Sequence, residues 1–147
     1  MPMKSFRGLM IDGAQNTIVL HTNNGSTGYR IVKFEMLPAT PGAVSQESVM
    51  KIYKIEQSAV DGVIDFSDNT LIAAGFYSDG AAAGEGPADS IITFDNEIFN
   101  QDIYITHSEV GNNESCNYYI ELEQVKLNLD ENTVATLKDI RNITQNE

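Results

Sequence analysis

The sequence predicts an all-β protein, an antiparallel β-sandwich with one short helix near its C-terminal end. Apolar and polar residues alternate with a period of two in several runs, such as YYIELE at residues 118–123, and this period is typical of half-buried strands. Breaks rich in Gly and Asn separate such runs, as at residues 110–115, and favour turns. The length of 147 residues suits one domain with its own core, and a single Cys excludes an internal disulfide.

Charge is distributed unevenly along the chain. Nine Lys and Arg stand against 21 Asp and Glu, which gives a net charge of −12. Residues 55–125 hold no base but fourteen of the acids, whereas residues 1–54 carry six bases and three acids. Most of the surface should therefore repel phosphate, and we expect no direct nucleic-acid binding. The acidic stretch indicates either a solvated face that keeps the protein soluble or a face for a basic partner, such as the N-terminal third of a neighbouring copy.

The first residues of the chain are expected to form an arm. Residues 1–14 contain Pro and Gly and few apolar side chains, which predicts an extended or loose segment. The apolar side chains at its centre would be costly to leave in water, so we expect them to be buried against a partner. The predicted interface consists of Lys4, Phe6, Arg7, Leu9 and Met10.

A hairpin is predicted directly after the arm. Residues 16–22 alternate like a strand, and Asn24-Gly25 in the break that follows tolerates the positive φ of a tight hairpin turn. The return strand covers residues 29–37. It would place Val32, Phe34 and Met36 on one face and Tyr29, Ile31 and Lys33 on the other.

Further strands are predicted in the middle of the chain. Residues 49–56 are apolar on both sides except for Lys51 and Lys54. This is more than one sheet face should need, and it favours a homo-oligomer. Residues 70–77 fit either a buried strand or a short helix, and the Gly and the aromatic pair at their end favour the strand. A shorter strand is expected at residues 91–94.

Three loops are expected to separate these strands. Residues 38–48 contain Pro and Gly, which disfavour both a helix and the hydrogen-bond ladder of a strand. Residues 57–69 predict a connection with a short strand at residues 63–66. Residues 78–90 are rich in Gly and Ala and predict the longest exposed loop, which is the first place to look for a contact surface.

A long hairpin is predicted to complete the sandwich. Residues 97–109 and 116–127 both have strand character, and the polar break at residues 110–115 joins them. Along the second arm the apolar phase slips by one residue. The slip predicts a β-bulge or a crossing between sheets near Glu123-Gln124.

The apolar residues within positions 131–142 recur with the spacing of a helix. Leu129 and Val134 flank an N-cap at Asp130 with the spacing of a hydrophobic staple. The predicted organisation is an N-terminal arm at residues 1–14, a β-sandwich domain at residues 15–129, and a C-terminal helix and tail at residues 130–147.

Groups suited to catalysis are sparse. His21 and His107 lack the spacing of metal ligands, so we interpret them as strand histidines with local hydrogen bonds. Cys116 is expected to be a small half-buried strand residue and not a reactive thiol. No phosphate-binding glycine motif is present. The sequence predicts no catalytic residue, no cofactor and no enzyme activity.

Calcium is the ion that the acidic loops would suit best. Hard cations prefer several oxygens on turns, and two groups of acids lie near turns. They are Asp61, Asp65 and Asp68, and Asp95, Glu97 and Asp102. Neither group has the spacing of a calcium-binding loop, so we predict fortuitous acidic loops and no metal site.

Four segments together resemble a known class of proteins. The segments TNNGSTGYRIVKF, FDNEIFNQDIYIT, NYYIELEQVKLNL and ENTVATLKDIRNIT look like small virion structural proteins of tailed bacteriophages of marine bacteria. The resemblance implies a non-enzymatic building block with a jelly-roll-like sandwich, and capsid decoration (cement) is the first expectation. A neck or tail component is the alternative within the class. A soluble receptor-binding or carbohydrate-binding module, with residues 78–90 as its contact loop, is the competing class. A cupin-like enzyme would want more than two His.

Partners and location follow from the resemblance and the composition. We expect a homo-oligomer, with a trimer favoured, in contact with a major capsid protein or another virion protein. No run approaches about 18 apolar residues, and no signal-like segment opens the chain, so no membrane partner is expected. The expected location is the virion, after synthesis in the host cytoplasm.

Overall fold

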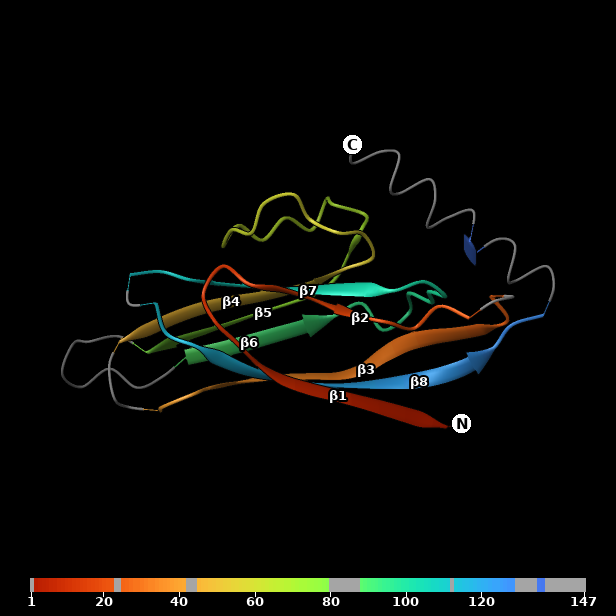
Figure 1. Ribbon diagram of the computed structural model, residues 1–147, viewed down its shortest axis with the longest axis horizontal. Helices are drawn as coiled ribbons and strands as arrows, with labels where there is room; N and C mark the ends of the chain where they lie inside the picture. Colours follow the sequence, from red (N-terminus) through yellow and green to blue (C-terminus); the bar gives the residue numbers. More distant parts are fainter. Residues whose placement is uncertain are drawn as a thin grey trace.

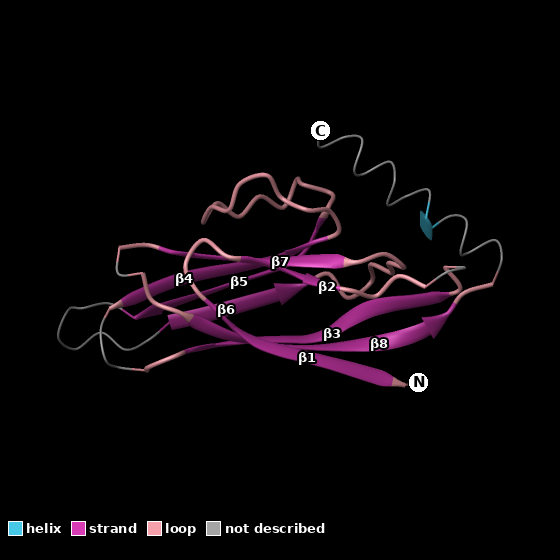
Figure 2. Cartoon of the chain, viewed as in Figure 1, coloured by secondary structure: helices cyan, strands magenta, loops and turns pink. Residues whose placement is uncertain are grey.

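The computed structural model describes residues 2–22, 25–41, 45–79, 88–111, 113–128 and 135–136. These residues form two antiparallel sheets that face each other, as Figures 1 and 2 show. The smaller sheet has the order β1 (Met3–Met10), β8 (Cys116–Lys126) and β3 (Thr27–Pro38). The larger sheet has the order β2 (Gln15–Ile18), β7 (Ile103–Glu109), β4 (Gln46–Tyr53), β5 (Leu71–Asp79) and β6 (Ala88–Thr93). The predicted all-β class is confirmed.

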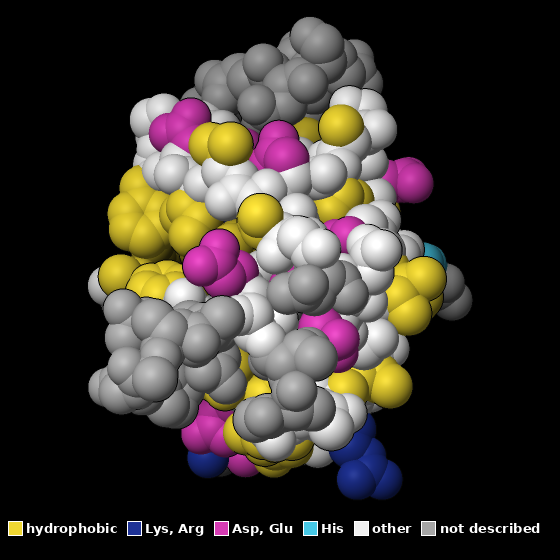
Figure 3. All heavy atoms as spheres, turned by 90° about the vertical axis from the view of Figure 1, so that its left-hand side faces the viewer, with side chains coloured by type: hydrophobic (Ala, Val, Ile, Leu, Met, Phe, Trp, Pro, Cys, Tyr) yellow, Lys and Arg dark blue, Asp and Glu magenta, His cyan; other side chains and the backbone are white. Residues whose placement is uncertain are grey.

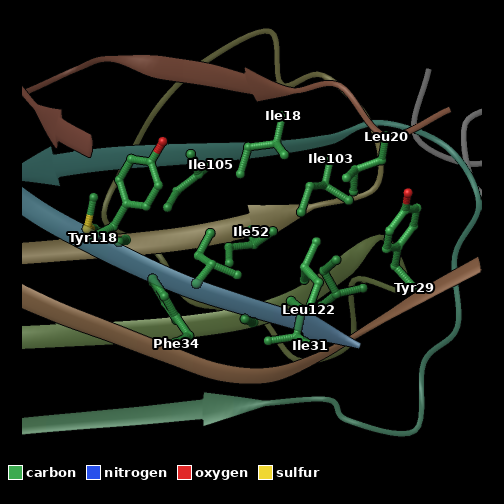
Figure 4. Packing of buried hydrophobic residues seen from close by; sticks show 14 of the residues in the cluster. Ile18, Leu20, Tyr29, Ile31, Phe34, Ile52, Ile103, Ile105, Tyr118 and Leu122 are labelled. Carbon is green, nitrogen blue, oxygen red and sulfur yellow. The ribbon is translucent and has the colours of Figure 1, made fainter. Parts of the chain in front are cut away.

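One hydrophobic core lies between the two sheets. Figure 4 shows Ile31, Phe34 and Leu122 of the smaller sheet facing side chains of the larger sheet, among them Ile52 and Ile105. Alternation places them there, because every second residue of a strand points to the same face. Burial of each such side chain contributes about 1.5–3 kcal/mol relative to exposure, so this layer is the main stabilising feature of the fold.

A bulge in β3 changes which of its residues face the core. The register between β3 and β8 shifts between Ile31 and Lys33, so Val32 is the extra residue. Tyr29, Ile31, Phe34 and Met36 are all buried as a result, although strict alternation put them on opposite faces. The irregularity predicted on β8 near Glu123-Gln124 therefore lies on the neighbouring strand, opposite the Glu121–Leu122 part of β8.

Neither predicted hairpin forms. β2 belongs to the larger sheet and β3 to the smaller one, and β7 and β8 are divided in the same way. The Asn-Gly signal is local, and Asn23 and Asn24 lie outside the described residues, but Gly25 does adopt a positive φ of 66°. Eight residues separate β2 from β3, and face-to-face sheets are only about 10 Å apart. Both breaks are therefore long enough to cross from one sheet to the other.

The N-terminal arm is a correction as well. Met3–Met10 form β1, which pairs with β8 along its whole length from Met3↔Glu123 to Met10↔Cys116. Met10 is buried in the core, and Phe6 packs against it. The segment has few apolar residues, but it needs few, because the ladder to β8 supplies its backbone hydrogen bonds. Residues 1–14 therefore contain a strand of the sandwich and not a loose arm.

The other elements follow the sequence more closely. β5 is a strand and not a helix, and residues 54–70 are a connection without the short strand expected at residues 63–66. Of residues 97–102, expected to be part of a strand, only Phe99 makes a bridge, to Tyr29. The structure does not describe most of the predicted loop at residues 78–90 or most of the predicted C-terminal helix. Of that helix it describes Ala135 and Thr136, which are helical.

Candidate interaction surface

The outer face of the larger sheet is covered in part by the protein's own chain. Residues 54–70 arch over β4 and β7, as the yellow connection in Figure 1 shows. Lys51 points outward from β4 and donates from Nζ to Asp61 Oδ1 at 2.9 Å and to the carbonyl oxygen of Val63 at 2.6 Å. This cover explains the apolar residues on both faces of β4, and it removes one reason for expecting an oligomer.

The electrostatics of this contact favour ionised partners. Burial opposes the charge of Lys51, but hydrogen bonds with Tyr53 and Asp61 outweigh it and raise the pKa of Lys51. The hydrogen bond from Lys51 lowers the pKa of Asp61. Tyr53 also lies beneath the ammonium, with its ring centroid 5.5 Å from Nζ. The connection is thus fixed on the sheet by a charged pair.

Beside this connection an open apolar hollow remains. Its volume is about 290 Å³. The residues that define the hollow here are Glu47, Val49, Ile64, Phe76, Ser78 and Val110. Val49 and Phe76 face each other across β4 and β5, Ile64 comes from the connection, and Val110 directly follows β7. Three large apolar side chains stay exposed here, Ile64 by 39%, Phe76 by 37% and Val110 by 61%.

One carboxylate, that of Glu47, lies beside these apolar side chains. Figure 3 looks at the end of the sandwich where β4 begins and β7 ends, and shows yellow hydrophobic side chains interspersed with magenta acids. The Lys and Arg side chains visible in that view lie at its lower edge, on the side of the smaller sheet. Exposed apolar groups rimmed by polar ones mark surfaces that bind other proteins or ligands.

The outer face of the smaller sheet is different in character. Arg30 forms two hydrogen bonds of 3.2 Å with the carboxylate of Glu123 on the neighbouring strand. Tyr119 donates to Glu121 at 2.7 Å. The first contact joins β3 to β8 and the second lies within β8. Because these polar side chains pair with one another, this part of the face is a solvated surface.

The structure divides the five residues predicted to form the interface. Phe6 and Met10 face inward and belong to the core of this chain, so they need no partner for burial. Lys4 is exposed with Nζ 5.9 Å from the ring centroid of Tyr29. Arg7 and Leu9 lie exposed on the outer face of β1. Only the last three remain available to a neighbouring molecule.

His107 and Cys116 are brought together inside the protein. His107 Nδ1 donates to the carbonyl oxygen of Ile11 at 3.0 Å, and Nε2 lies 2.9 Å from Ser48 Oγ, which accepts from Gln46. Burial raises the pKa of Cys116 to about 11, against an opposing hydrogen bond with Ser48. His107 and Cys116 are both fully buried. The network joins strands of both sheets, and it offers neither a thiolate nor access for a substrate.

His21 lies after β2 and pairs with Asp102 at 2.7 Å. Asp102 Oδ1 also accepts from the backbone N–H groups of Leu20 and His21. Burial opposes its ionisation, but these hydrogen bonds outweigh that effect and lower the pKa of Asp102. The carboxylate therefore holds the turn after β2 against the segment before β7.

Carboxylate oxygens of the acidic loops accept hydrogen bonds from nearby residues of the same loops. Asp65 Oδ1 accepts from the N–H and the hydroxyl of Ser67. Asp68 does the same for Thr70. Among the described residues no group of three His, Cys, Asp or Glu side chains is placed to hold a metal ion.

The hollow was not predicted from the sequence. Ile64, Phe76 and Val110 lie far apart in the chain and meet only through the order β7-β4-β5. The available signal is the run of apolar residues in the connection, Val63, Ile64 and Phe66, which by itself favours a short strand.

Comparisons with known proteins add no relative. No family model matches the chain, and no curated protein matches it. In the part of the chain that the structure describes, no helix has the length and apolar character needed to cross a membrane.

Proposed function

We propose that this protein is a non-enzymatic structural component of a phage particle, and that within the particle it decorates and cements the capsid. The observation that carries the proposal is the apolar hollow on the larger sheet. It is open, its lining includes the carboxylate of Glu47, and the strands β4 and β5 hold most of its side chains. Such a surface suits docking on another folded protein more than turnover of a small substrate.

A jelly-roll arrangement is part of this proposal. Eight-stranded jelly rolls arise when a long antiparallel ribbon is rolled into two sheets. The pairings β1-β8, β2-β7 and β4-β5 fit such a ribbon, and the neighbours β8-β3 and β7-β4 fit its rolling. The fourth ribbon pair, β3 with β6, is replaced by pairing of β6 with β5.

The C-terminal helix is proposed in the same way. Ala135 is buried and helical, and Asn100 donates from Nδ2 to Thr136 Oγ1 at 2.9 Å. These contacts support a helix over residues 131–142 that packs near the segment before β7.

The proposed working state is a homo-oligomer, with a trimer favoured, bound to the major capsid protein or another virion protein. The exposed apolar side chains of the hollow support association. The proposed location is the virion, after synthesis in the host cytoplasm.

Mass spectrometry of purified particles tests the proposal. Hundreds of copies per particle are expected for a decoration protein. A copy number that matches one ring would assign the protein to the neck or tail instead. Absence of the chain from the particles would overturn the structural role, and binding to a glycan or a cell-surface receptor would then favour the competing class.

A further inference from the structure

The hollow has the properties of an acceptor surface. Phe76 on β5, Ile64 on the connection and Val110 after β7 expose apolar area, and Glu47 of β4 lies beside them. No ion pair links the carboxylate of Glu47 to any of the described residues. An occupant with complementary chemistry would therefore present an apolar side chain and a cation at neighbouring positions.

The outer face of β1 presents this chemistry. Arg7 and Leu9 are two residues apart on one strand, so both side chains point away from the core. Leu9 is 57% exposed, and Leu37 of β3, across Asn117, is 64% exposed. Within the described parts of the chain Arg7 has no ion-pair partner either. Leu9 and Leu37 supply the apolar part of this surface and Arg7 supplies its cation, and we call these three residues the β1 face.

The two surfaces lie at the same end of the sandwich but on different sheets. β1 ends at Met10 opposite Cys116, the first residue of β8. The six residues 110–115 connect that point to the end of β7, next to Val110 of the hollow. One molecule cannot seat its β1 face in its own hollow, because the core lies between them.

We infer that the occupant of the hollow is the β1 face of a second copy of this chain, with Leu9 on Ile64 and Phe76 and with Arg7 paired to Glu47. The contact is between unlike surfaces. Copies joined in this way form a closed set if the rotation closes and an open chain if it does not. Association buries the apolar residues of both surfaces and places opposite charges together, which gives specificity to the contact.

Charge reversal tests the pairing directly. Arg7→Glu and Glu47→Lys are made singly and together in the full chain, and self-association is measured by analytical ultracentrifugation. Each single reversal is expected to weaken association by about tenfold or more, and the double variant, which restores an opposite pair, should recover most of the loss. Lys126→Glu and Glu56→Lys reverse exposed charges outside both surfaces and serve as matched controls.

Each outcome decides the inference. A wild-type chain that stays monomeric up to about 1 mM overturns it, and so does a double variant that associates no better than the single ones. Circular dichroism and thermal unfolding of each variant show whether the fold is intact, since all four positions are exposed. Leu9→Ser provides a second route, because it removes the apolar contact without a change of charge and should also weaken association.

The inference does not depend on membership of a particle. It concerns the purified chain alone, whereas the proposed function is decided by the composition of particles. The contact between copies can be refuted while the role in the particle stands, and the reverse is also possible.

Discussion

Lys51 Nζ lies 2.9 Å from Asp61 Oδ1, and this pair joins the middle of β4 to the connection that covers it. The lysine side chain is only 4% exposed, whereas that of Asp61 is 62% exposed. Ile64, one wall of the hollow, follows Asp61 by three residues. The position of that wall therefore depends on an ion pair formed across ten residues of chain.

Asp61→Asn should destabilise the protein. The substitution leaves a nearly buried ammonium with only neutral acceptors, but the exposure of Asp61 allows water to replace part of the loss. We expect a decrease of about 1–2 kcal/mol in the free energy of unfolding, measured by urea denaturation. Asp65→Asn is the control, because Asp65 is exposed and bonds only within its own turn, and it should change stability by less than about 0.5 kcal/mol. Equal losses in the two variants would contradict this role for the pair.

The same pair predicts how stability depends on pH. The pKa of Asp61 is lowered in the folded protein, so its contribution is present above the ordinary value of 3.8 and is lost as the pH falls through the folded value. The pKa of Lys51 is raised, so its contribution is present below 10.5 and is lost as the pH rises through the folded value. The stability difference between wild type and Asp61→Asn should be constant from about pH 5 to pH 9 and should shrink below about pH 4. Chemical denaturation at a series of pH values measures it, and a difference that persists in acid would contradict the assignment.

Gly75 is expected to tolerate no side chain. A Cβ there would lie 2.8 Å from Ile91 Cγ1 and 2.9 Å from Met36 Sδ, between the two sheets. Gly75→Ala should lower the free energy of unfolding by about 1–3 kcal/mol through overpacking. Gly62→Ala is the matched control, because its Cβ would meet nothing closer than 3.8 Å. Equal urea midpoints for the two alanine variants would show that the sheets do not approach each other closely at Gly75.

Met10 and Leu9 are neighbours with opposite roles. Met10 is buried in the core and Leu9 is exposed on β1. Met10→Ala should cost about 2–5 kcal/mol, whereas Leu9→Ala should stay within about 0.5 kcal/mol when measured on the monomer at low concentration. Thermal or chemical unfolding of the two variants tests the strand assignment of Met3–Met10. A larger loss of stability for Leu9→Ala than for Met10→Ala would contradict the strand and favour a loose arm.

Cys116 should be inert in the folded protein. Burial raises the pKa of its thiol to about 11, so almost no thiolate is present at neutral pH. A thiol reagent such as a dithiobis-nitrobenzoate should react with it only after urea unfolds the chain. Stoichiometric reaction at pH 8 without denaturant, on the time scale of an exposed thiol, would show that this strand opens readily.

The sequence predicted the strands better than their partners. Alternation identified β8, because burial on one face leaves a period that a single segment displays. The Gly and the aromatic pair at residues 75–77 indicated the strand character of β5. The hairpins were wrong because Asn-Gly and similar breaks specify a bend, whereas the choice of partner strand depends on the whole core. The same limit applies to β1, whose eight residues are stabilised by β8, more than a hundred positions later in the chain.

The candidate site was less accessible to prediction than the fold. Leu9 was selected because an apolar side chain is costly to expose on a loose arm, and Arg7 because a basic arm suits an anchoring contact with a neighbour. Both are exposed for another reason, which is the outward phase of β1. The hollow depends on three strands and one connection, none of which carries a motif. Val32 shows the same effect on a smaller scale, since the bulge there is invisible to a period of two and decides which side of β3 is buried.

The pairing of the first strand with the last has a consequence for biosynthesis. β1 leaves the ribosome before β8, and its partner residues from Cys116 to Glu123 are made about 110 residues later. At about 5–20 residues per second, the edge of β1 waits for roughly 5–20 s without its ladder. The central strand of the smaller sheet is therefore the last one to arrive, and β3 also has no hydrogen-bonded partner in that sheet until then. A nascent chain of this protein must be kept from pairing with its neighbours on the polysome until β8 has been made.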